Sequence, residues 1–488
     1  MNRLYRNIIL ISIVVLSFFM HYEKFSYDII GNHVWRQTQT QTTINNFYEE
    51  DMNILNPRRN DRGNTDGIQR MEFPLMQWIT ALLYKIFGKY VLITRLFMFI
   101  TGMVSILGIY KLLSSLFHNR ILSVIGTWAF SFSPSFYFHS INPMPDNLAL
   151  CCSVWGLALF FTWYNDKRPI ILVLSGILLS IGTLCKLPFI IYYIVPGIYF
   201  LRKIFTQGIN KKIIIQSATI FGFVFFPLIW YVSVIPQWND NVIVKGMFNN
   251  KEPISLILRY MRHILFSTLP ESLINYGSLV FFFAGFYFLY KRESFKDEKF
   301  ILILALSVIA LIYYLFEANA IAKVHDYYLF PFYPLIFMLV AYGAYNLYIL
   351  KNAIWKYLTI FLLLLLPVTC FLRMDGRWKP EAPRFNKDFL AYKDELRNAV
   401  PKNALIVTGN DISHFIYFYY TDKKGWGFDN DNLSSSDLND MINKGAEYLY
   451  SDSRLLEEKE DIRQYLDSLI LEKGSVRIYK LSNRNNLN

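Results

Sequence analysis

The sequence predicts an α-helical polytopic membrane protein with a small C-terminal α/β domain. Of the 488 residues, 54% are hydrophobic and 18% are charged, whereas soluble domains average about 45–50% apolar and about 25% charged residues. The excess falls in nearly uncharged blocks of about 15–25 residues, the length at which a helix crosses a bilayer core of roughly 30 Å. The alternating segments of about ten residues that are typical of a membrane β-barrel do not occur in the sequence.

About eleven apolar segments are long enough to be predicted as membrane spans. The first covers Ile8–Met20 and follows Arg3 and Arg6. Because His21–Lys24 offers no small-x-small cleavage pattern, this segment is predicted to be a retained signal-anchor rather than a signal peptide. The other predicted spans are 91–110, 121–139, 147–164, 169–185, 187–201, 212–235, 278–290, 299–316, 327–349 and 353–372.

The distribution of Lys and Arg predicts the orientation of these spans. The formal net charge is +12, but the basic residues lie mainly in short loops, which indicates topology rather than a nucleic-acid partner. These basic loops alternate with an opposite set of segments, which contains every long loop: 21–90, 140–146, 236–277, 317–326 and the tail after 372. The positive-inside rule therefore predicts a multi-pass protein of the cell's inner (plasma) membrane, with a cytoplasmic N-terminus and this opposite set outside.

Two domains are predicted. Residues 1–372 form a transmembrane helical module with a long outer loop at 21–90, and residues 373–488, where charges are frequent, form a soluble extracytoplasmic α/β domain. In this domain the pattern predicts helices over 386–400 and 436–444 and strands over 404–407, 448–450 and 476–480. Gly425-Trp426-Gly427 predicts a turn, because the further glycine and the strand-turn-helix setting of a phosphate loop are missing.

The four cysteines argue against a disulfide framework or a zinc site. All of them lie in or beside apolar segments, and none has metal-ligand spacing with a histidine. No cofactor is firmly predicted, and a divalent metal is left open.

The long first loop is dense in polar groups, above all at 31–38, 56–63 and 71–75. Its arginines, whose planar guanidinium groups pair well with phosphate oxygens, are Arg36, Arg58, Arg59 and Arg62. Contact with lipid head groups is the alternative, but four arginines in one outer loop run against the positive-inside trend and favour a specific anionic ligand. The residues after Pro74, up to Lys85, predict a helix in the membrane interface.

Three further polar groups stand at predicted outer ends of spans. Asp146 is the lone acid in the turn 142–147, where it either caps a helix or faces an outer cavity. Lys186 follows the span 169–185 and either snorkels to the interface or binds a phosphate. The segment 323–331 brings Lys323, His325, Asp326, Tyr327 and Tyr328 to the start of a span. Its two tyrosines also fit an aromatic belt, whereas Lys323 and His325 suit a phosphate or a sugar hydroxyl.

In their order along the chain these motifs resemble the GT-C glycosyltransferases, in particular the protein O-mannosyltransferases and aminoarabinose transferases. The resemblance covers nearly the whole chain, and it rests on the first span, the long outer loop, Glu72-Phe73-Pro74-Leu75, Pro143-Met144-Pro145-Asp146, Lys186-Leu187-Pro188, the run His325–Pro331 and the C-terminal domain. It implies inverting-type transfer of a hexosyl or pentosyl group from a polyprenyl-phosphate donor to an acceptor hydroxyl on the outer face of the membrane. The acceptor would be a glycolipid, a cell-envelope glycan or a protein.

The resemblance also implies roles for individual residues. Asp146 matches an acidic position of the family, and an outer-loop acid acts as the general base. Where much of the family has an Asp-Glu pair, this chain has Trp35-Arg36-Gln37. The base is therefore open among Asp61, Glu72 and His33, with Asp28 a further acid in that region. Donor-phosphate ligands are expected to be Arg36, Arg58, Lys186, Lys323 and His325, and substrate ligands Trp35, Gln37, Asp326, Tyr327 and Tyr328.

Two other functions compete with this one. A flippase or transporter of lipid-linked sugars would place ionisable residues in the middle of the membrane, whereas here they cluster at the predicted outer ends of spans. A surface-glycan polymerase or ligase would have one very long central outer loop, whereas here the first loop and the tail are longest. The predicted partners are therefore a polyprenyl-phosphate-linked sugar, a lipid or glycan acceptor and the bilayer, with no nucleic acid.

Overall fold

The computed structural model describes residues 2–238, 253–292, 298–323 and 325–482. They form two compact units. The first, called the membrane unit below, consists of Met1–Ser26, Met71–Met76 and Thr94–Gly376. The second, called the sheet unit, consists of Tyr27–Arg70, Gln77–Ile93 and Arg377–Asn488. The sheet unit thus includes much of the long first loop, and the predicted domain boundary at 372 stays a prediction.

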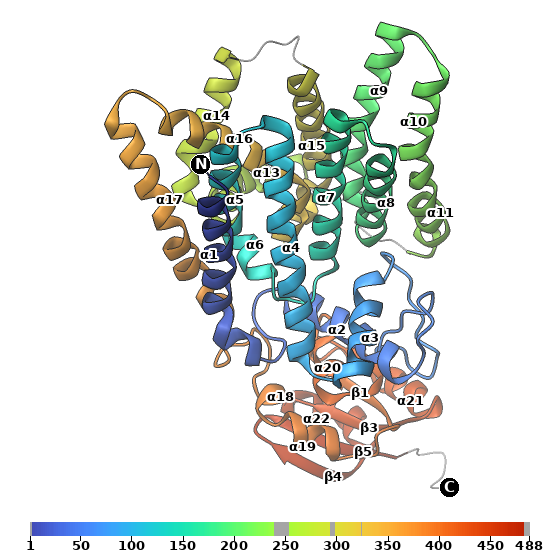
Figure 1. Ribbon diagram of the computed structural model, residues 1–488. Coiled ribbons are helices and arrows are strands. Elements are labelled where there is room, and N and C mark those ends of the chain that lie inside the picture. The colour runs from blue at the N-terminus through green and yellow to red at the C-terminus, as the bar shows by residue number, and fades with distance from the viewer. Residues whose placement is uncertain (1, 239–252, 293–297, 324, 483–488) are drawn as a thin grey trace. The chain divides into compact units, whose positions relative to one another are not determined.

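The membrane unit is built of helices (Figure 1). They are α1 (Arg3–His21), α4 (Val91–Phe117), α5 (Arg120–Ser131), α6 (Pro134–His139), α7 (Pro145–Asp166), α8 (Pro169–Cys185), α9 (Ile194–Gln207), α10 (Lys211–Phe221), α11 (Phe225–Val234), α13 (Ile254–His263), α14 (Leu279–Arg292), α15 (Glu298–Lys323), α16 (Tyr333–Tyr348) and α17 (Ala353–Met374). Short 3₁₀ segments η2 (Leu187–Tyr193) and η8 (Asp326–Phe332) precede α9 and α16, and a π-helical segment, η6 (Ile264–Ile274), follows α13.

Within the described residues, eight helical stretches are long and apolar enough to cross a membrane. A ninth is counted if the pair Ile254–Ile274 and Tyr276–Lys291, bent by 98°, is one broken span. Two of the roughly eleven predicted spans fall short of a full crossing. The segment 169–185 is a helix of 17 residues, and the segment 121–139 is broken between α5 and α6. Pro134 starts α6, and a proline inside one continuous helix would remove a backbone hydrogen bond.

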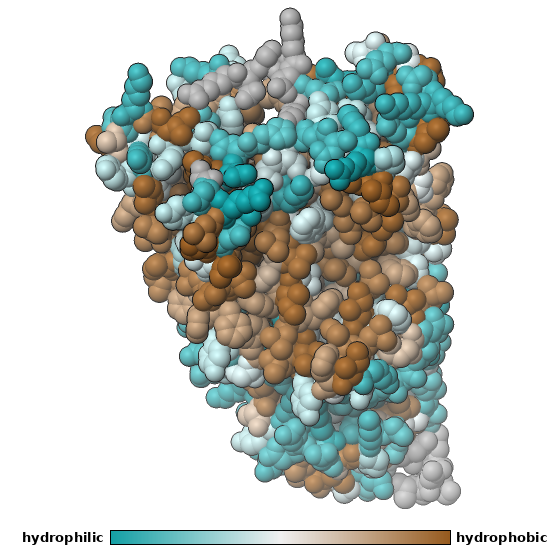
Figure 2. All heavy atoms as spheres, viewed as in Figure 1, coloured by the Kyte–Doolittle hydropathy of each residue, from teal (hydrophilic) through white to brown (hydrophobic). Residues whose placement is uncertain are grey.

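The surface of the membrane unit suits a lipid environment. Figure 2 shows hydrophobic residues gathered in a broad band over its helices. Large apolar side chains in this unit are exposed, among them Ile11, Ile100 and Leu364. Such a continuous apolar surface is stable in contact with lipid tails and costly in water. The chain is therefore a multi-pass membrane protein.

The ends of the helices sort by charge. The N-terminus and the connections α4–α5, α9–α10 and α16–α17, which carry or adjoin basic residues such as Arg120, Lys211 and Lys351, lie at one end of the membrane unit (Figure 1). The start of α7 and the end of α8 lie at the opposite end, since these two helices meet at 166–169 on the basic side. Asp146 and Lys186 consequently share the end away from the basic loops.

The sheet unit contains five strands, β1 (Leu405–Gly409), β2 (Lys424–Phe428), β3 (Ala446–Ser451), β4 (Leu466–Lys473) and β5 (Val476–Leu481), in the order β2-β1-β3-β5-β4. β1 is parallel to β2 and β3, whereas β5 is antiparallel to β3 and β4. Its helices are α2 (Val34–Glu49), most of α3 (Leu75–Phe87), α18 (Asp388–Ala391), α19 (Lys393–Asn398), α20 (Ile416–Thr421), α21 (Ser435–Asn443), α22 (Arg454–Glu457) and α23 (Glu460–Arg463).

The three predicted strands and the helix over 436–444 are confirmed, as β1, β3, β5 and α21. The helix expected over 386–400 is divided into α18 and α19, and β4 was not predicted. The turn expected at 425–427 is wrong, because these residues lie in β2. A Cβ on Gly425 would lie 1.8 Å from the carbonyl oxygen of Ile406. The glycine therefore permits a close approach of two strands rather than a reversal of the chain.

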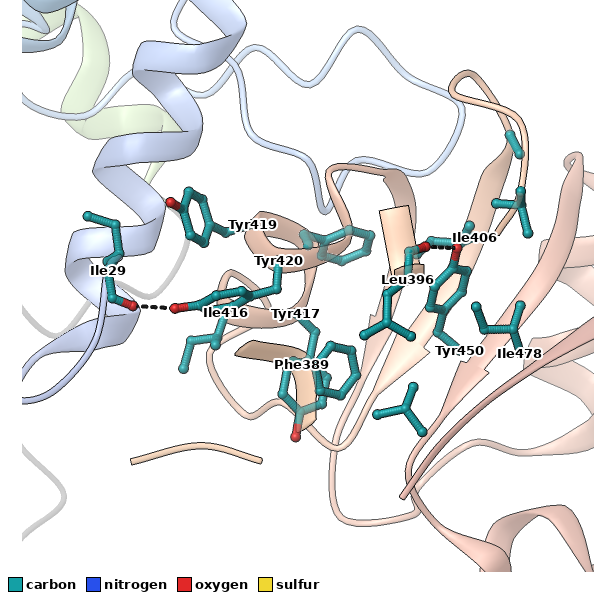
Figure 3. Packing of buried hydrophobic residues seen from close by; sticks show 14 of the residues in the cluster. Ile29, Phe389, Leu396, Ile406, Ile416, Tyr417, Tyr419, Tyr420, Tyr450 and Ile478 are labelled. Atoms are coloured by element: carbon teal, nitrogen blue, oxygen red, sulfur yellow. Dashed lines mark hydrogen bonds between the residues drawn. The ribbon is translucent and has the colours of Figure 1, made fainter. Parts of the chain in front are cut away.

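One core joins the first loop to the C-terminal sheet. Ile29 and Val34 pack in the same buried cluster as Phe389, Tyr417 and Tyr450 (Figure 3). The rings of Phe389 and Tyr417 stack with centroids 3.7 Å apart. The loop residues and the tail therefore fold as one body.

Candidate functional site

The turn that carries Asp146 is held by a buried network in the membrane unit. Arg95 of α4 is fully buried, and its Nη1 donates to Asn142 Oδ1 at 2.9 Å. Asn142 Nδ2 donates to the Phe138 carbonyl at 2.9 Å, and Asn147 Nδ2 donates to the His139 carbonyl at 2.6 Å. These bonds fix the residues on both sides of Asp146, so its carboxylate has little freedom to move.

Asp146 stands in the first turn of α7, where its charge is favoured by the helix dipole. The N-cap residue is Met144, whose side chain makes no capping bond. The carboxylate is 1% exposed, and its Oδ1 lies 3.5 Å from Lys186 Nζ. Its Oδ2 is buried and accepts no hydrogen bond from the residues that the structure describes. Since an unmade bond at a buried carboxylate oxygen is costly, this oxygen is suited to receive a donor from a ligand.

Lys186 joins two elements in an extended conformation, at φ −159° and ψ 113°, where α8 ends and η2 begins. Its ammonium lies 4.8 Å from the ring centroid of Tyr328 and 5.7 Å from that of Tyr327. The residue is only 9% exposed. The aromatic faces and the Asp146 carboxylate both attract the ammonium in this apolar setting.

Lys186 also lines a cavity of about 260 Å³ in the membrane unit. Two carboxylates, Glu72 and Glu317, line the same cavity. The rest of the lining is apolar or aromatic and consists of Leu187, Pro188, Ile190, Ile191, Tyr231, Ile235, Trp238, Tyr313, Phe316 and Tyr328. The apolar walls suit a hydrocarbon body, and Lys186 offers a cation to an anionic head in a lining that also carries the two carboxylates.

The backbone next to Glu72 is fixed by the helices around it. Phe73 N donates to the Leu184 carbonyl at 3.0 Å, and Trp230 Nε1 donates to the Met71 carbonyl at 2.9 Å. The rings of Phe73 and Trp230 meet edge to face with centroids 5.0 Å apart. Glu72 is thereby positioned between two anchored residues.

Glu317 is a site residue that the sequence reasoning missed. The segment 317–326 was predicted as an outer loop, but α15 continues to Lys323. Glu317 is 5% exposed and belongs to an apolar stretch. The signal was a lone acid at the end of an uncharged run, because acids in such runs are rare and usually functional.

The segment after α15 is tied to α6. Asp326 Oδ1 lies 3.1 Å from His139 Nε2, and Ser135 Oγ donates to Asp326 Oδ2 at 3.4 Å. Tyr327 is buried, with its hydroxyl 2.8 Å from His325 Nδ1. Two of the expected ligands in this segment, Tyr327 and Tyr328, have their ring centroids 5.7 Å and 4.8 Å from the Lys186 ammonium. The side chain of Lys323 lies outside the described residues.

The remaining predicted site residues belong to the sheet unit. Asp61 accepts from Gly427 N at 3.1 Å and lies 3.4 Å from His414 Nδ1. This bond to Asp61 raises the pKa of His414 above its usual value, against the opposing effect of burial. Arg58 pairs with Glu50 at 3.7 Å and Asp51 at 3.4 Å. Asp61 and Arg58 thus already have protein partners within this unit.

Helix α2 and the residue before it hold four further candidates. Arg36 is 7% exposed, and its Nη1 donates to Gln39 Oε1 at 2.6 Å. Gln37 is fully buried, with its Nε2 donating to the Asn32 carbonyl at 2.7 Å. Trp35 packs against the shared core of the sheet unit, and His33 precedes the helix with a positive φ of 57°.

Asp28 also has partners within the sheet unit. It bonds to Lys393 and accepts from Tyr419 Oη at 2.5 Å. Burial alone would raise the pKa of Asp28, but Lys393 and Tyr419 outweigh it and lower this pKa. A carboxylate with a lowered pKa is a weaker proton acceptor.

Comparisons with known proteins agree with this architecture. Residues 72–231 match the family model described as dolichyl-phosphate-mannose-protein mannosyltransferase. The matched segment contains Glu72, Asp146 and Lys186. A search of curated proteins found no match.

Several solved structures are similar in fold to this chain. ArnT from Cupriavidus metallidurans in the apo state aligns with a TM-score of 0.66 at 10% identity, covering 98% of each chain. The same protein bound to undecaprenyl phosphate aligns with a TM-score of 0.62 at 10% identity, over 98% of this chain and 97% of that one. The apo oligosaccharyltransferase of Archaeoglobus fulgidus aligns with a TM-score of 0.61 at 13% identity, over 92% of this chain and 70% of that one.

Proposed function

We propose that the chain is a glycosyltransferase of the GT-C type, which transfers a sugar from a polyprenyl-phosphate donor to an acceptor hydroxyl on the outer face of the membrane. The family model that matches residues 72–231 and the similar folds of ArnT and the oligosaccharyltransferase support this proposal. The observation that carries the proposal is the buried pair of Asp146 and Lys186, 3.5 Å apart. Lys186 of this pair opens onto a largely apolar cavity with two further carboxylates. This set supplies a cation for a phosphate, a carboxylate base for a hydroxyl proton and apolar walls for a prenyl chain.

The donor binds with its phosphate at Lys186 and its first isoprene units against the apolar lining. Charge-assisted bonds to a phosphate are each worth about 1.5–3 kcal/mol, and they are stronger in a site from which water is excluded. The ArnT structure with undecaprenyl phosphate supports this class of lipid, since the two folds align over nearly their full lengths. Tyr328, which faces Lys186, lies at the edge of the donor site.

We assign the remaining catalytic roles to two carboxylates, Asp146 and Glu72. Asp146 holds Lys186 in place, and its Oδ2 receives a hydrogen bond from a substrate hydroxyl. Glu72 is the general base, because it lines the cavity beside Lys186. Asp61 and Asp28 are assigned structural roles, because each already has partners in the sheet unit.

The bond changes balance without any other reactant. The acceptor oxygen attacks the anomeric carbon while the bond from that carbon to the phosphate oxygen breaks. The hydroxyl proton passes to Glu72, and the released polyprenyl phosphate keeps the electron pair of the broken bond. The ammonium of Lys186 stabilises the charge that develops on this leaving group, which is where a fixed cation lowers the barrier most.

Turnover by the purified protein tests the proposal. The full chain is incubated in detergent micelles with a panel of polyprenyl-phosphate sugars and a cell-envelope extract as acceptor, and free polyprenyl phosphate is measured by mass spectrometry. Release with at least one donor, dependent on the acceptor, is expected. A flippase would give none, because micelles have no second leaflet and flipping breaks no bond. Absence of release with every donor would remove the proposal.

A further inference from the structure

A second hollow lies in the sheet unit, along β4 and β5 and beside α22 and α23. Its volume is about 440 Å³, within the range of roughly 300–1,000 Å³ that is usual for small-molecule sites. It is lined by Arg454, Glu457, Glu458, Arg463, Leu466, Asp467, Leu469, Glu472, Arg477 and Tyr479. None of these residues takes part in the proposed transfer chemistry. We call this hollow the β4 groove.

A buried charge pair forms part of the groove's lining. Arg477 Nε donates to Glu457 Oε2 at 2.5 Å, and Tyr479 Oη donates to the same oxygen at 2.9 Å. The side chains of Arg477 and Glu457 are 7% and 8% exposed. Both donors converge on Oε2, and the buried Oε1 accepts no hydrogen bond from the described part of the chain. A buried carboxylate oxygen without a hydrogen bond can accept one from a ligand donor.

Donors and acceptors alternate in the rest of the lining. Glu472 Oε1 lies 3.4 Å from Arg454 Nη2 and 3.8 Å from Arg477 Nη1. Three guanidinium groups stand among four carboxylates in the groove, so their charges nearly cancel. A phosphate site would need an excess of cationic donors. A divalent cation would need carboxylate oxygens without competing guanidinium groups.

A hydroxyl group both donates and accepts hydrogen bonds, and this matches a surface where the two kinds of group alternate. Leu466 and Leu469 also line the groove, and Leu469 is 49% exposed. Such exposed apolar side chains suit the C–H face of a sugar ring.

We propose that the β4 groove binds a neutral saccharide, with one sugar hydroxyl donating to Glu457 Oε1 and neighbouring hydroxyls bonding to Arg454 and Glu472. The assignment of this saccharide as part of a glycan acceptor rests on the proposed transferase function. The binding itself does not depend on that function and is tested separately.

Saturation-transfer NMR of the full chain tests the groove. The protein is held in a detergent without a sugar head group and mixed with a panel of neutral methyl hexosides and pentosides. At least one glycoside is expected to receive magnetisation, and Glu457→Gln is expected to lower this signal at least fivefold. Arg454→Ala is a second variant, and because its side chain is 73% exposed it leaves the fold intact. It is expected to lower the signal as well.

Two controls locate the binding. Lys444→Ala removes an exposed cation that pairs with Asp440 on α21, outside the groove, and the signal should persist. Asp146→Asn alters the proposed transfer site, and the signal should persist there too. No signal in the wild type, or an equal signal in both groove variants, overturns the inference. A signal lost in Asp146→Asn but kept in Glu457→Gln also overturns it, while it supports sugar binding at the transfer site. Wild-type binding without any turnover would instead count against the proposed function alone.

Discussion

At the scale of single residues, variants of the buried pair Asp146 and Lys186 can separate its role in stability from its role in activity. Lys186→Met leaves the Asp146 carboxylate buried without its cation, which typically costs about 3–5 kcal/mol. The double variant Asp146→Asn/Lys186→Met has no buried charge left and should regain most of that stability. Because the donor phosphate has lost its cation, both variants should stay inactive. Thermal unfolding and turnover measured on the same samples check this, and an active double variant would leave the pair a purely structural role.

His414 provides a residue-scale prediction about pH. Its pKa is raised above the usual 6.5, first through its bond to Asp61. A raised folded-state pKa stabilises the folded state fully below the unfolded pKa, and the stabilisation is lost as the pH rises through the folded pKa. The sheet unit should therefore lose stability as the pH rises from about 6. His414→Gln should remove this dependence, which Trp426 fluorescence during urea unfolding at several pH values would detect. Parallel pH profiles of variant and wild type would contradict it.

At the scale of elements, β2 contains a position, Gly425, where any side chain would be strained. Gly425 has φ +147°, and a Cβ there would meet the Ile406 carbonyl. Gly425→Ala should lower the free energy of unfolding by about 1–3 kcal/mol, the usual cost of forcing a residue into such a conformation. The matched control is Gly222→Ala, because nothing lies within 4 Å of a Cβ at Gly222 and its φ is not positive. Urea unfolding of both variants makes the comparison, and equal midpoints would refute the packing argument.

Elements formed by local interactions were predictable from the sequence, whereas elements formed by contacts between distant residues were not. The apolar helices were predicted well because span length and loop charge are local properties of the sequence. Asp146 and Lys186 stood out because each is an isolated charge beside a predicted span. Glu317 was missed because the end of α15 was placed too early. β2 was missed because Gly425 serves a close contact with β1, which only the folded sheet reveals.

The role of the first loop could not be read from local patterns. Tyr420 Oη donates to the Ile29 carbonyl at 2.6 Å across 391 residues of sequence, and Gly425 N donates to the Asn60 carbonyl at 3.1 Å. These bonds bring loop residues into the sheet unit. Asp61 and Arg58 looked free in the sequence, and their partners are visible only after the loop has folded against strand β2 or back on itself.

At the scale of the whole molecule, the orientation in the membrane is the main prediction. The basic connections lie at one end of the membrane unit (Figure 1), and the positive-inside rule places that end in the cytoplasm. A reporter fused at Lys351 should then be cytoplasmic, and one fused at Asn488 should be outside. Paired fusions to a cytoplasmic and an extracytoplasmic reporter enzyme decide this, and the same compartment for both positions would refute the topology.

The central claim is that the chain breaks a polyprenyl-phosphate-sugar bond at the site of Asp146 and Lys186. The most direct measurement is the rate of polyprenyl phosphate release by the wild type, Asp146→Asn and Asp166→Asn. Asp166 is exposed at the other end of the same helix, so its variant controls for the substitution itself. The account predicts release by the wild type and Asp166→Asn, and a rate lower by about 10²–10³ in Asp146→Asn, because Lys186 then loses the carboxylate that holds it beside the leaving phosphate. Full activity in a normally folded Asp146→Asn protein would contradict it.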